Sequence, residues 1–323
     1  MRLGLRFASE DDVAGYLFPG QGVQFVGMGR ELYDGSIAAR EVFDEVDTSL
    51  DRSISALMFE GPEDVLRETK NAQPAIMTAS LAALKAMFEK LGEDNVPRPV
   101  LMAGHSLGEY TALHVAGVLG VGDAALLVEE RGRLMQEACE QNPGSMAAVL
   151  GLDLVTMETV AKDTGAYVSN VNTHDQIVIS GGSANVARAC DKALVKGARK
   201  TIPLKVGGAF HSSLMSSASE GLAEVVDRLD FRDPSVPIVA NSTGEIVTTA
   251  AEIKCELITQ ISSCVQWRRS IRYMIETGIS RFIEIGPGRT LSSMVKRIDG
   301  SVETDSVSDM KSITKLRHTG QRT

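Results

Sequence analysis

The sequence predicts an α/β protein in which a large domain built on a parallel sheet carries an inserted smaller domain. Short apolar strands alternate with helices along most of the 323 residues, a pattern typical of a parallel sheet covered on both faces. Between residues 139 and 206 the order changes to strand, helix, strand, strand, helix, strand, as in a ferredoxin-like (βαββαβ) unit. We therefore expect a discontinuous large domain at 1–138 and 207–300, a ferredoxin-like domain at 139–206 and a flexible tail at 301–323.

The first part of the large domain contains the clearest periodic signal. Apolar residues from Met77 to Leu91 follow steps of four and three, which predicts a well-packed helix. Two short apolar segments run directly into glycine-containing turns and read as strands. The expected elements are a strand at 13–18, helices at 44–57, 63–68 and 75–91, a strand at 99–103, and helices from 109 and at 123–138.

The inserted domain and the second part of the large domain are predicted from shorter segments. The insertion begins and ends beside the large domain, so its two ends must lie close together. Its expected elements are strands at 145–152, 166–171, 176–180 and 200–204, with helices at 154–162 and 185–196. The large domain then resumes with helices at 220–229, 251–260 and 270–276 and strands at 236–240 and 281–285. Periodicity is lost from about residue 300, which suggests the tail.

Composition excludes several classes of function. The net charge is -9 and basic residues are scattered, so we expect no nucleic-acid partner. No apolar run approaches membrane-spanning length, and acidic residues occupy the N-terminus where a signal peptide would be apolar. The four cysteines and five histidines are dispersed without metal-ligand spacing. We expect a cytoplasmic protein, monomeric by default, with no metal and no cofactor.

The turn after the 99–103 strand carries the sequence Gly104-His105-Ser106-Leu107-Gly108, which matches G-x-S-x-G. Between a strand and a helix, the glycines let the backbones crowd at a sharp turn that exposes the serine oxygen, as in the α/β-hydrolase-like fold. The amide of Leu107 would then lie at a helix N-terminus, where it can stabilise an oxyanion. The pentapeptide recurs by chance, and its position between strand and helix is what favours a nucleophile over an ordinary turn.

A serine nucleophile needs a base, and His211 is the best candidate among the histidines. It follows the last strand of the insertion, where the chain re-enters the main sheet, and lies between glycines and small residues. The alternative is a loop histidine without a catalytic role, whose hydrogen bonds are all made within the protein. His105 is next to Ser106, but neighbouring side chains diverge in such a turn, so we expect it to line the pocket.

Arg131 lies on the apolar stripe of its expected helix, beside Leu127, Leu134 and Met135. A guanidinium in that position is costly unless it is paired. An internal carboxylate could pair with it, or it could await a carboxylate on a substrate, which its planar fork would hold with two hydrogen bonds. These residues alone do not decide between the two.

Six motifs taken together resemble the malonyl-CoA:acyl carrier protein transacylase family over about residues 16–298. They are FPGQG at 18–22, GHSLGEY at 104–110, RGRLM at 131–135, AFHS at 209–212, Gln260 shortly before VQW at 265–267, and EIGPG at 284–288. One departure is Cys264, which stands where a proline is common in the family.

The resemblance implies a role for each catalytic group. Ser106 would carry the acyl group as an ester, and His211 would move the proton. The histidine would be oriented by the backbone carbonyl of Gln260 instead of an acidic side chain. The amides of Gln21 and Leu107 would form the oxyanion hole.

The resemblance also implies how the acyl group is held. Arg131 would bind the free carboxylate of the malonyl group, and Asn170 would help to shape the cleft between the domains, with His105 in the pocket. Phe210, before the histidine, is the residue usual in members that use malonyl rather than methylmalonyl groups. A bulky Phe beside the α-carbon would discourage a branching methyl, although one methyl is worth only about 1–3 kcal/mol.

The implied enzyme is an acyl-carrier-protein S-malonyltransferase of fatty acid biosynthesis, with a coenzyme A thioester and an acyl carrier protein as its partners. Three alternatives stay open. A discrete acyltransferase of a polyketide pathway would use the same chemistry on another carrier. A serine esterase or thioesterase would use the same nucleophile, although the carboxylates between Ser106 and His211 lie mostly in the insertion, the wrong place for a third acid. A non-catalytic docking domain of the same fold is the third alternative, and it would have no need to keep Ser106, His211 and Arg131.

Overall fold

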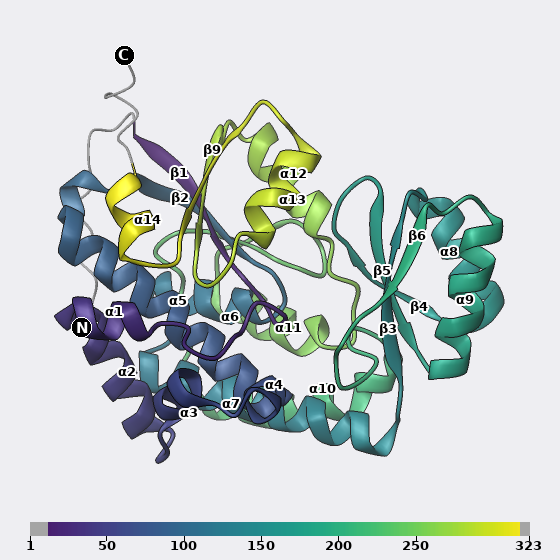
Figure 1. The fold of residues 1–323 in the computed structure, drawn as a ribbon, viewed down its shortest axis with the longest axis horizontal. Helices are drawn as coiled ribbons and strands as arrows, with labels where there is room; N and C mark the ends of the chain where they lie inside the picture. The colour runs from purple at the N-terminus through teal and green to yellow at the C-terminus, as the bar shows by residue number, and fades with distance from the viewer. Residues whose placement is uncertain (1–11, 317–323) are drawn as a thin grey trace.

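The computed structural model describes residues 12–316, which form a large domain around a mostly parallel sheet and a small domain around an antiparallel sheet (Figure 1). The large sheet has the strand order β10-β9-β1-β2-β7-β8; the first five strands are parallel, and β8 runs antiparallel to β7. Its strands are β1 (Val13–Phe18), β2 (Arg98–Gly104), β7 (Ile238–Val239), β8 (Ile246–Val247), β9 (Arg281–Ile285) and β10 (Glu303–Val307).

Helices cover both faces of this sheet because side chains alternate along each strand. In β1, Tyr16 and Phe18 join the apolar core that includes α5, whereas Leu17 joins a second core with Trp267 of α12 and Leu291 of α13. The helices of the large domain are α1 (Arg30–Gly35), α2 (Ile37–Ser49), α3 (Ile54–Glu60), α4 (Glu63–Arg67), α5 (Thr69–Leu91), α6 (Leu107–Val115), α7 (Val121–Gln141), α10 (Ser216–Arg228), α11 (Ala250–Gln260), α12 (Trp267–Glu276), α13 (Thr290–Ile298) and α14 (Met310–Lys315). None of the helices in 12–316 is long and apolar enough to cross a bilayer.

The small domain has the βαββαβ order expected, with the strand order β4-β5-β3-β6 and antiparallel neighbours throughout. Along β3, Ala147 and Val149 pack under the two helices, while Met146 and Ala148 face the large domain. The elements are β3 (Ser145–Leu150), α8 (Leu154–Thr164), β4 (Tyr167–Val171), β5 (Gln176–Gly181), α9 (Ser183–Val195) and β6 (Lys200–Pro203).

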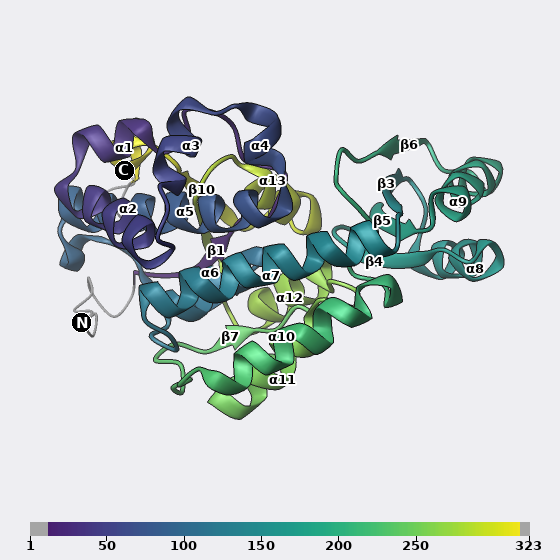
Figure 2. The same cartoon turned by 90° about the horizontal axis from the view of Figure 1, so that it is seen from below.

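The small domain is joined to the large one by a shared helix and by backbone pairing, among other contacts. Helix α7 extends from the large domain to the small sheet, as Figure 2 shows. Strand β4 also joins the segment before α12 by backbone hydrogen bonds, from Val171 N to Val265 O at 2.9 Å and from Val265 N to Ser169 O at 2.8 Å. The carboxyl ends of β1, β2 and β7 therefore lie beside one face of the small sheet, and the candidate site is at that junction.

Two expectations about elements are wrong. The helix expected at 44–57 is two helices, because α2 ends at Ser49, Asp51 has a positive φ of 49°, and Ser53 caps α3 by accepting a hydrogen bond from Ala56 N. The tail expected at 301–323 is ordered at 303–315, where β10 pairs with β9 and α14 packs against α5 through the buried Ile313. Residues 317–323 of that expected tail lie outside the described residues.

Candidate active site

The turn between β2 and α6 is a sharp strand-to-helix elbow that needs both of its glycines. A Cβ on Gly104 would lie 1.8 Å from the carbonyl carbon of Gly108, and a Cβ on Gly108 would lie 1.9 Å from the carbonyl oxygen of Phe18. No side chain fits at either distance. The motif therefore lets β1, β2 and the start of α6 approach closely enough to place Ser106 at the carboxyl ends of the strands.

Ser106 has a strained backbone, with φ 52° and ψ -106°. Such a conformation persists only where neighbouring groups hold it. Asn241, just after β7, does so: its Oδ1 accepts a hydrogen bond from Ser106 N at 2.7 Å, and its Nδ2 donates to Gly104 O at 2.7 Å. The serine oxygen is thereby fixed at the N-terminus of α6.

His211 meets Ser106 from across the elbow. Its Nε2 lies 2.8 Å from Ser106 Oγ, and its Nδ1 lies 2.9 Å from the backbone carbonyl oxygen of Gln260. An Nδ1–H donated to that carbonyl leaves Nε2 free to accept the serine proton. Burial, reinforced by the positive charge of Arg131, lowers the pKa of His211 to about 3, so the imidazole is neutral and able to act as a base.

Arg131 on α7 is 1% exposed and lies beside the same serine. Its Nη2 donates to Ser106 Oγ at 3.0 Å and to Gln260 Oε1 at 2.9 Å, while Nη1 donates to Gln73 Oε1 at 2.7 Å. Its guanidinium also lies 4.9 Å above the ring of Tyr110. All of these partners are neutral, and no carboxylate within 12–316 forms an ion pair with Arg131. A buried cation without a counter-ion suits an anionic ligand better than a purely structural role.

A cavity of about 250 Å³ between the domains collects the residues expected from the sequence. Its lining includes Gln21, His105, Ser106, Leu107, Arg131, Asn170, Phe210 and His211, whereas Gln260 contacts the site from behind. The Gln21 and Leu107 amides donate to no acceptor among the described residues, so both are available to a ligand oxygen. The fold therefore brings the residues expected from the sequence together from six separate segments.

Four further residues support the site and were not singled out from the sequence. Gln73 and Asn241 hold Arg131 and Ser106, Asn172 Oδ1 lies 3.0 Å from His105 Nε2, and Glu109 accepts a hydrogen bond from Gln260. A signal existed for two of them. Gln73 is a polar residue that continues the apolar stripe of 77–91 backwards by four positions, and Asn241 follows directly after a parallel strand.

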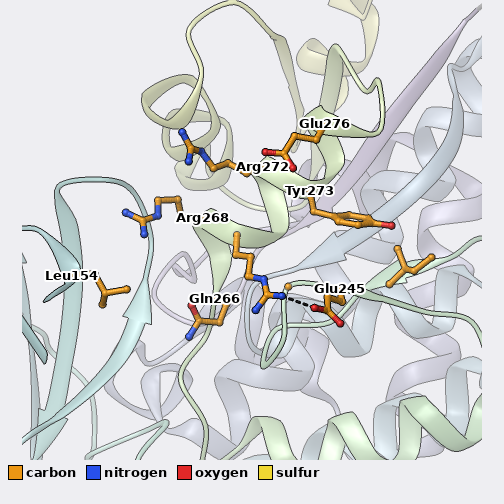
Figure 3. A pocket seen from close by; sticks show the side chains of 10 residues that line it. Leu154, Glu245, Gln266, Arg268, Arg272, Tyr273 and Glu276 are labelled. Atoms are coloured by element: carbon orange, nitrogen blue, oxygen red, sulfur yellow. Dashed lines mark hydrogen bonds and ion pairs between the residues drawn. The ribbon is translucent and has the colours of Figure 1, made fainter.

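A second, wider hollow of about 740 Å³ lies on the outside of α12 and is separate from the catalytic residues (Figure 3). Arg268, Arg272 and Tyr273 of α12 line it together with Leu154 of the small domain and Glu245, and the dashed line marks the ion pair from Glu245 to Arg269. Neither Ser106 nor His211 reaches it. The smaller cavity is therefore the site where the chemistry is assembled.

Comparison with known proteins agrees with this geometry. The sequence matches the acyl transferase domain family over residues 15–322. It is 44% identical over 303 residues to the malonyl CoA-acyl carrier protein transacylase of Bacillus subtilis (strain 168), covering 92% of this chain and 94% of the relative. The crystal structure of acyl-carrier-protein-S-malonyltransferase from Bartonella henselae superposes with a TM-score of 0.90 at 38% identity, covering 94% of this chain and 98% of that chain.

A further solved structure shows a relative together with a partner. It is a malonyl-transacylase in complex with its type II polyketide synthase acyl-carrier protein, and it superposes with a TM-score of 0.89 at 35% identity, covering 93% of this chain and 97% of that chain. Matches of this extent, over nearly the whole of each chain, establish family membership. The chain belongs to the acyl transferase family and, within it, to the malonyl-CoA:acyl carrier protein transacylases.

Proposed function

We propose that this enzyme transfers the malonyl group from malonyl-CoA to the phosphopantetheine thiol of an acyl carrier protein through a malonyl ester on Ser106. One observation carries the proposal: a serine–histidine pair 2.8 Å apart shares a cavity with a buried arginine that forms no ion pair among residues 12–316. The pair supplies acyl transfer chemistry, and the arginine selects an acyl group that ends in a carboxylate.

Acylation begins when Ser106 Oγ attacks the thioester carbonyl carbon and His211 Nε2 takes the hydroxyl proton. The carbonyl oxygen becomes an oxyanion, which the free Leu107 and Gln21 amides can stabilise; the loss of one such donor typically costs about 10²–10³ in rate. The carbon–sulfur bond then breaks, and the imidazolium returns its proton to the departing coenzyme A thiolate. A malonyl ester on Ser106 remains.

Transfer repeats these steps with a second thiol. His211 takes the proton of the carrier's thiol, the thiolate sulfur attacks the ester carbonyl, and the ester carbon–oxygen bond breaks. The proton passes back to Ser106 Oγ. Every proton moves through one histidine, which is held by a backbone carbonyl and not by a carboxylate, so this arrangement differs from the Ser-His-Asp template of hydrolases. The reaction as proposed needs no metal and no organic cofactor.

Acyl selection follows from the groups around Ser106. In the malonyl ester the free carboxylate is two carbons from the carbonyl, within reach of Arg131 Nη2, which lies 3.0 Å from Ser106 Oγ. Phe210 lines the same cavity and is 6% exposed, so it restricts the space available to a branch on the α-carbon. We therefore propose a preference for malonyl over acetyl, which lacks the charge, and over methylmalonyl, which adds a methyl.

Fatty acid synthesis is the pathway that we propose, because the B. subtilis relative at 44% identity carries the general transacylase name. The polyketide complex among the similar structures keeps a polyketide carrier as the second candidate partner. A cytoplasmic, monomeric enzyme is consistent with substrates that are themselves soluble thioesters. Hydrolysis is the competing outcome of the same acyl-enzyme, and the test below separates it from transfer.

The test is to incubate the purified protein with malonyl-CoA and measure its intact mass, beside acetyl-CoA, methylmalonyl-CoA and a Ser106→Ala variant. We expect a malonyl adduct that is absent from the variant and is discharged by an added phosphopantetheinylated carrier of either pathway. Release of free malonate at the rate of coenzyme A formation would instead identify a thioesterase. No adduct and no turnover with any donor would overturn the enzymatic proposal.

A further inference from the structure

Gln260 connects the three catalytic groups through different atoms. Its backbone carbonyl accepts from His211 Nδ1 at 2.9 Å, its Oε1 accepts from Arg131 Nη2 at 2.9 Å, and its Nε2 donates to the backbone oxygen of Ser106 at 3.0 Å. The side chain is fully buried. The orientation of this amide therefore bears on the position of Arg131, whereas the elbow is also held independently by Asn241 at Ser106 N and Gly104 O.

The orientation of this amide matters because its two ends have opposite hydrogen-bonding character. With Oε1 toward Arg131, an acceptor meets a guanidinium donor. A rotation by half a turn would place the Nε2 hydrogens against the guanidinium hydrogens, and the arginine would lose one of its three fixed partners. A buried donor without an acceptor is unfavourable, so the arginine would be displaced from its position beside Ser106.

Glu109, together with the backbone oxygen of Ser106, selects one orientation of the Gln260 amide. It lies on the first turn of α6, is 1% exposed and is absent from the lining of the catalytic cavity. Its Oε2 accepts from Gln260 Nε2, and its Oε1 accepts from the backbone N of Asn241 at 3.3 Å. Since the carboxyl oxygens lie against two N–H donors, the nitrogen end of the Gln260 amide faces Glu109 and the oxygen end faces Arg131.

We propose that Glu109 is a positioning residue for acyl selection, which acts by fixing the Gln260 amide so that Arg131 is held in place to receive the malonyl carboxylate. The inference rests on the proposed function and adds to it a residue whose side chain does not line the catalytic cavity and makes no hydrogen bond to Ser106 among the described residues. Glu109 differs in this from Gln73, which contacts Arg131 directly.

The test is the substitution Glu109→Gln, which keeps the shape and removes one acceptor. The amide oxygen of the introduced Gln can accept a hydrogen bond from Asn241 N or from Gln260 Nε2, but not from both. Its NH₂ group then faces the remaining N–H donor, which is unfavourable. Rotation of the Gln260 amide relieves that opposition, but it breaks the hydrogen bonds of that amide to Arg131 and to the backbone oxygen of Ser106. We expect kcat/KM for malonyl-CoA to fall about tenfold or more while the slow acylation by acetyl-CoA changes less than about twofold, so that discrimination between the two donors falls about tenfold.

Glu256 provides the matched control. It is a second buried glutamate close to the site, but its carboxylate accepts from Ser242 N at 2.8 Å and from Ser242 Oγ and makes no hydrogen bond to Gln260 among the described residues. Glu256→Gln should keep the discrimination of the parent enzyme within about twofold. Thermal melting of each variant shows whether it is folded. If Glu109→Gln does not fold, Glu109→Asp keeps two acceptor oxygens one methylene further away and should lose discrimination only in part.

Two results would overturn the inference. One is a Glu109→Gln enzyme that discriminates as well as the parent, and the other is an equal loss for both donors, which would indicate a general structural role. If Glu109→Asp has to be used instead, discrimination equal to that of the parent enzyme would likewise overturn the inference. These outcomes remain distinct from failure of the proposed function, because in that case the parent protein itself forms no malonyl adduct on Ser106.

Discussion

In the proposed mechanism, Arg131 is the single residue that determines which acyl group the enzyme accepts. We predict that Arg131→Ala lowers kcat/KM for malonyl-CoA by about 10- to 150-fold, since hydrogen bonds to charged groups contribute about 1.5–3 kcal/mol. Acylation by acetyl-CoA should change little, because acetyl has no carboxylate to lose. The measurement is the rate of adduct formation with each donor.

Arg133 is the control for this substitution. It lies on the same helix two residues on, is exposed, and pairs with Glu130 and Glu137. Arg133→Ala should leave both rates unchanged. Equal losses with malonyl and acetyl donors in Arg131→Ala would contradict the selection role and leave Arg131 as a structural group.

The lowered pKa of His211 predicts an unusual dependence of the rate on pH. Histidine ordinarily titrates near pH 6.5, but burial lowers the pKa of His211 to about 3. The neutral form is the base, and it persists below pH 6.5. We predict that kcat/KM for malonyl-CoA stays level from about pH 8 to about pH 5, where an unperturbed histidine would already have lost most of its activity. The measurement is the initial rate of coenzyme A release across this range.

Loss of folded protein is the effect to separate from this profile. The unfolded chain binds a proton at His211 near pH 6.5 and the folded chain does not, so the free energy of unfolding falls as the pH drops from about 6.5 toward about 3. Near-UV circular dichroism recorded at each pH therefore marks the range in which the protein is folded and the rate reports on His211. A reversible decline in rate with a midpoint near pH 6.5 would show that His211 titrates normally.

The elbow between β2 and α6 is the element on which the site depends. We predict that Gly104→Ala lowers the free energy of unfolding by about 3 kcal/mol or more, because its Cβ would lie 1.8 Å from the Gly108 carbonyl carbon and the backbone has to move. Gly120→Ala is the matched control, since its φ is -65° and a Cβ there has open space. It should change stability by less than about 1 kcal/mol. Urea unfolding measures both, and equal stabilities would refute the close approach.

The same element shows what sequence could and could not predict. G-x-S-x-G between a strand and a helix can be recognised locally, because both glycines are at positions where a Cβ would overlap neighbouring backbone. The contacts of Asn241 and Gln73 with the site come from chain segments far away in sequence, and no local pattern encodes which distant side chain arrives there. The break between α2 and α3 has no clear local signal for a related reason: Ser53 can continue a helix or cap the next one, and only the fold selects the cap.

The arrangement of the whole molecule was predictable where the alternation was strong. The βαββαβ unit buries one face of β3 under its helices and turns the other toward the large domain, so both domains depend on the same period of two. Its order therefore predicts a ferredoxin-like unit, and the structure has a separate small antiparallel sheet there. The C-terminal segment offered no such signal, because β10 is the polar sequence ETDSV, which is held to β9 through backbone pairing. Its polar composition predicts disorder, but backbone pairing with β9 and the buried Val307 order the strand.

The C-terminal segment also gives a test at the scale of the whole fold. Ile313 of α14 is 0% exposed and joins the main core, whereas Lys311 on the same helix is exposed. We predict that Ile313→Ala lowers the free energy of unfolding by about 2–5 kcal/mol, the usual range for a buried large-to-small change, while Lys311→Ala stays within about 0.5 kcal/mol. Both are measured by urea unfolding of the full chain. A flexible tail would make the two variants equal, so unchanged stability in Ile313→Ala would show that the last strand and helix do not close this edge of the sheet.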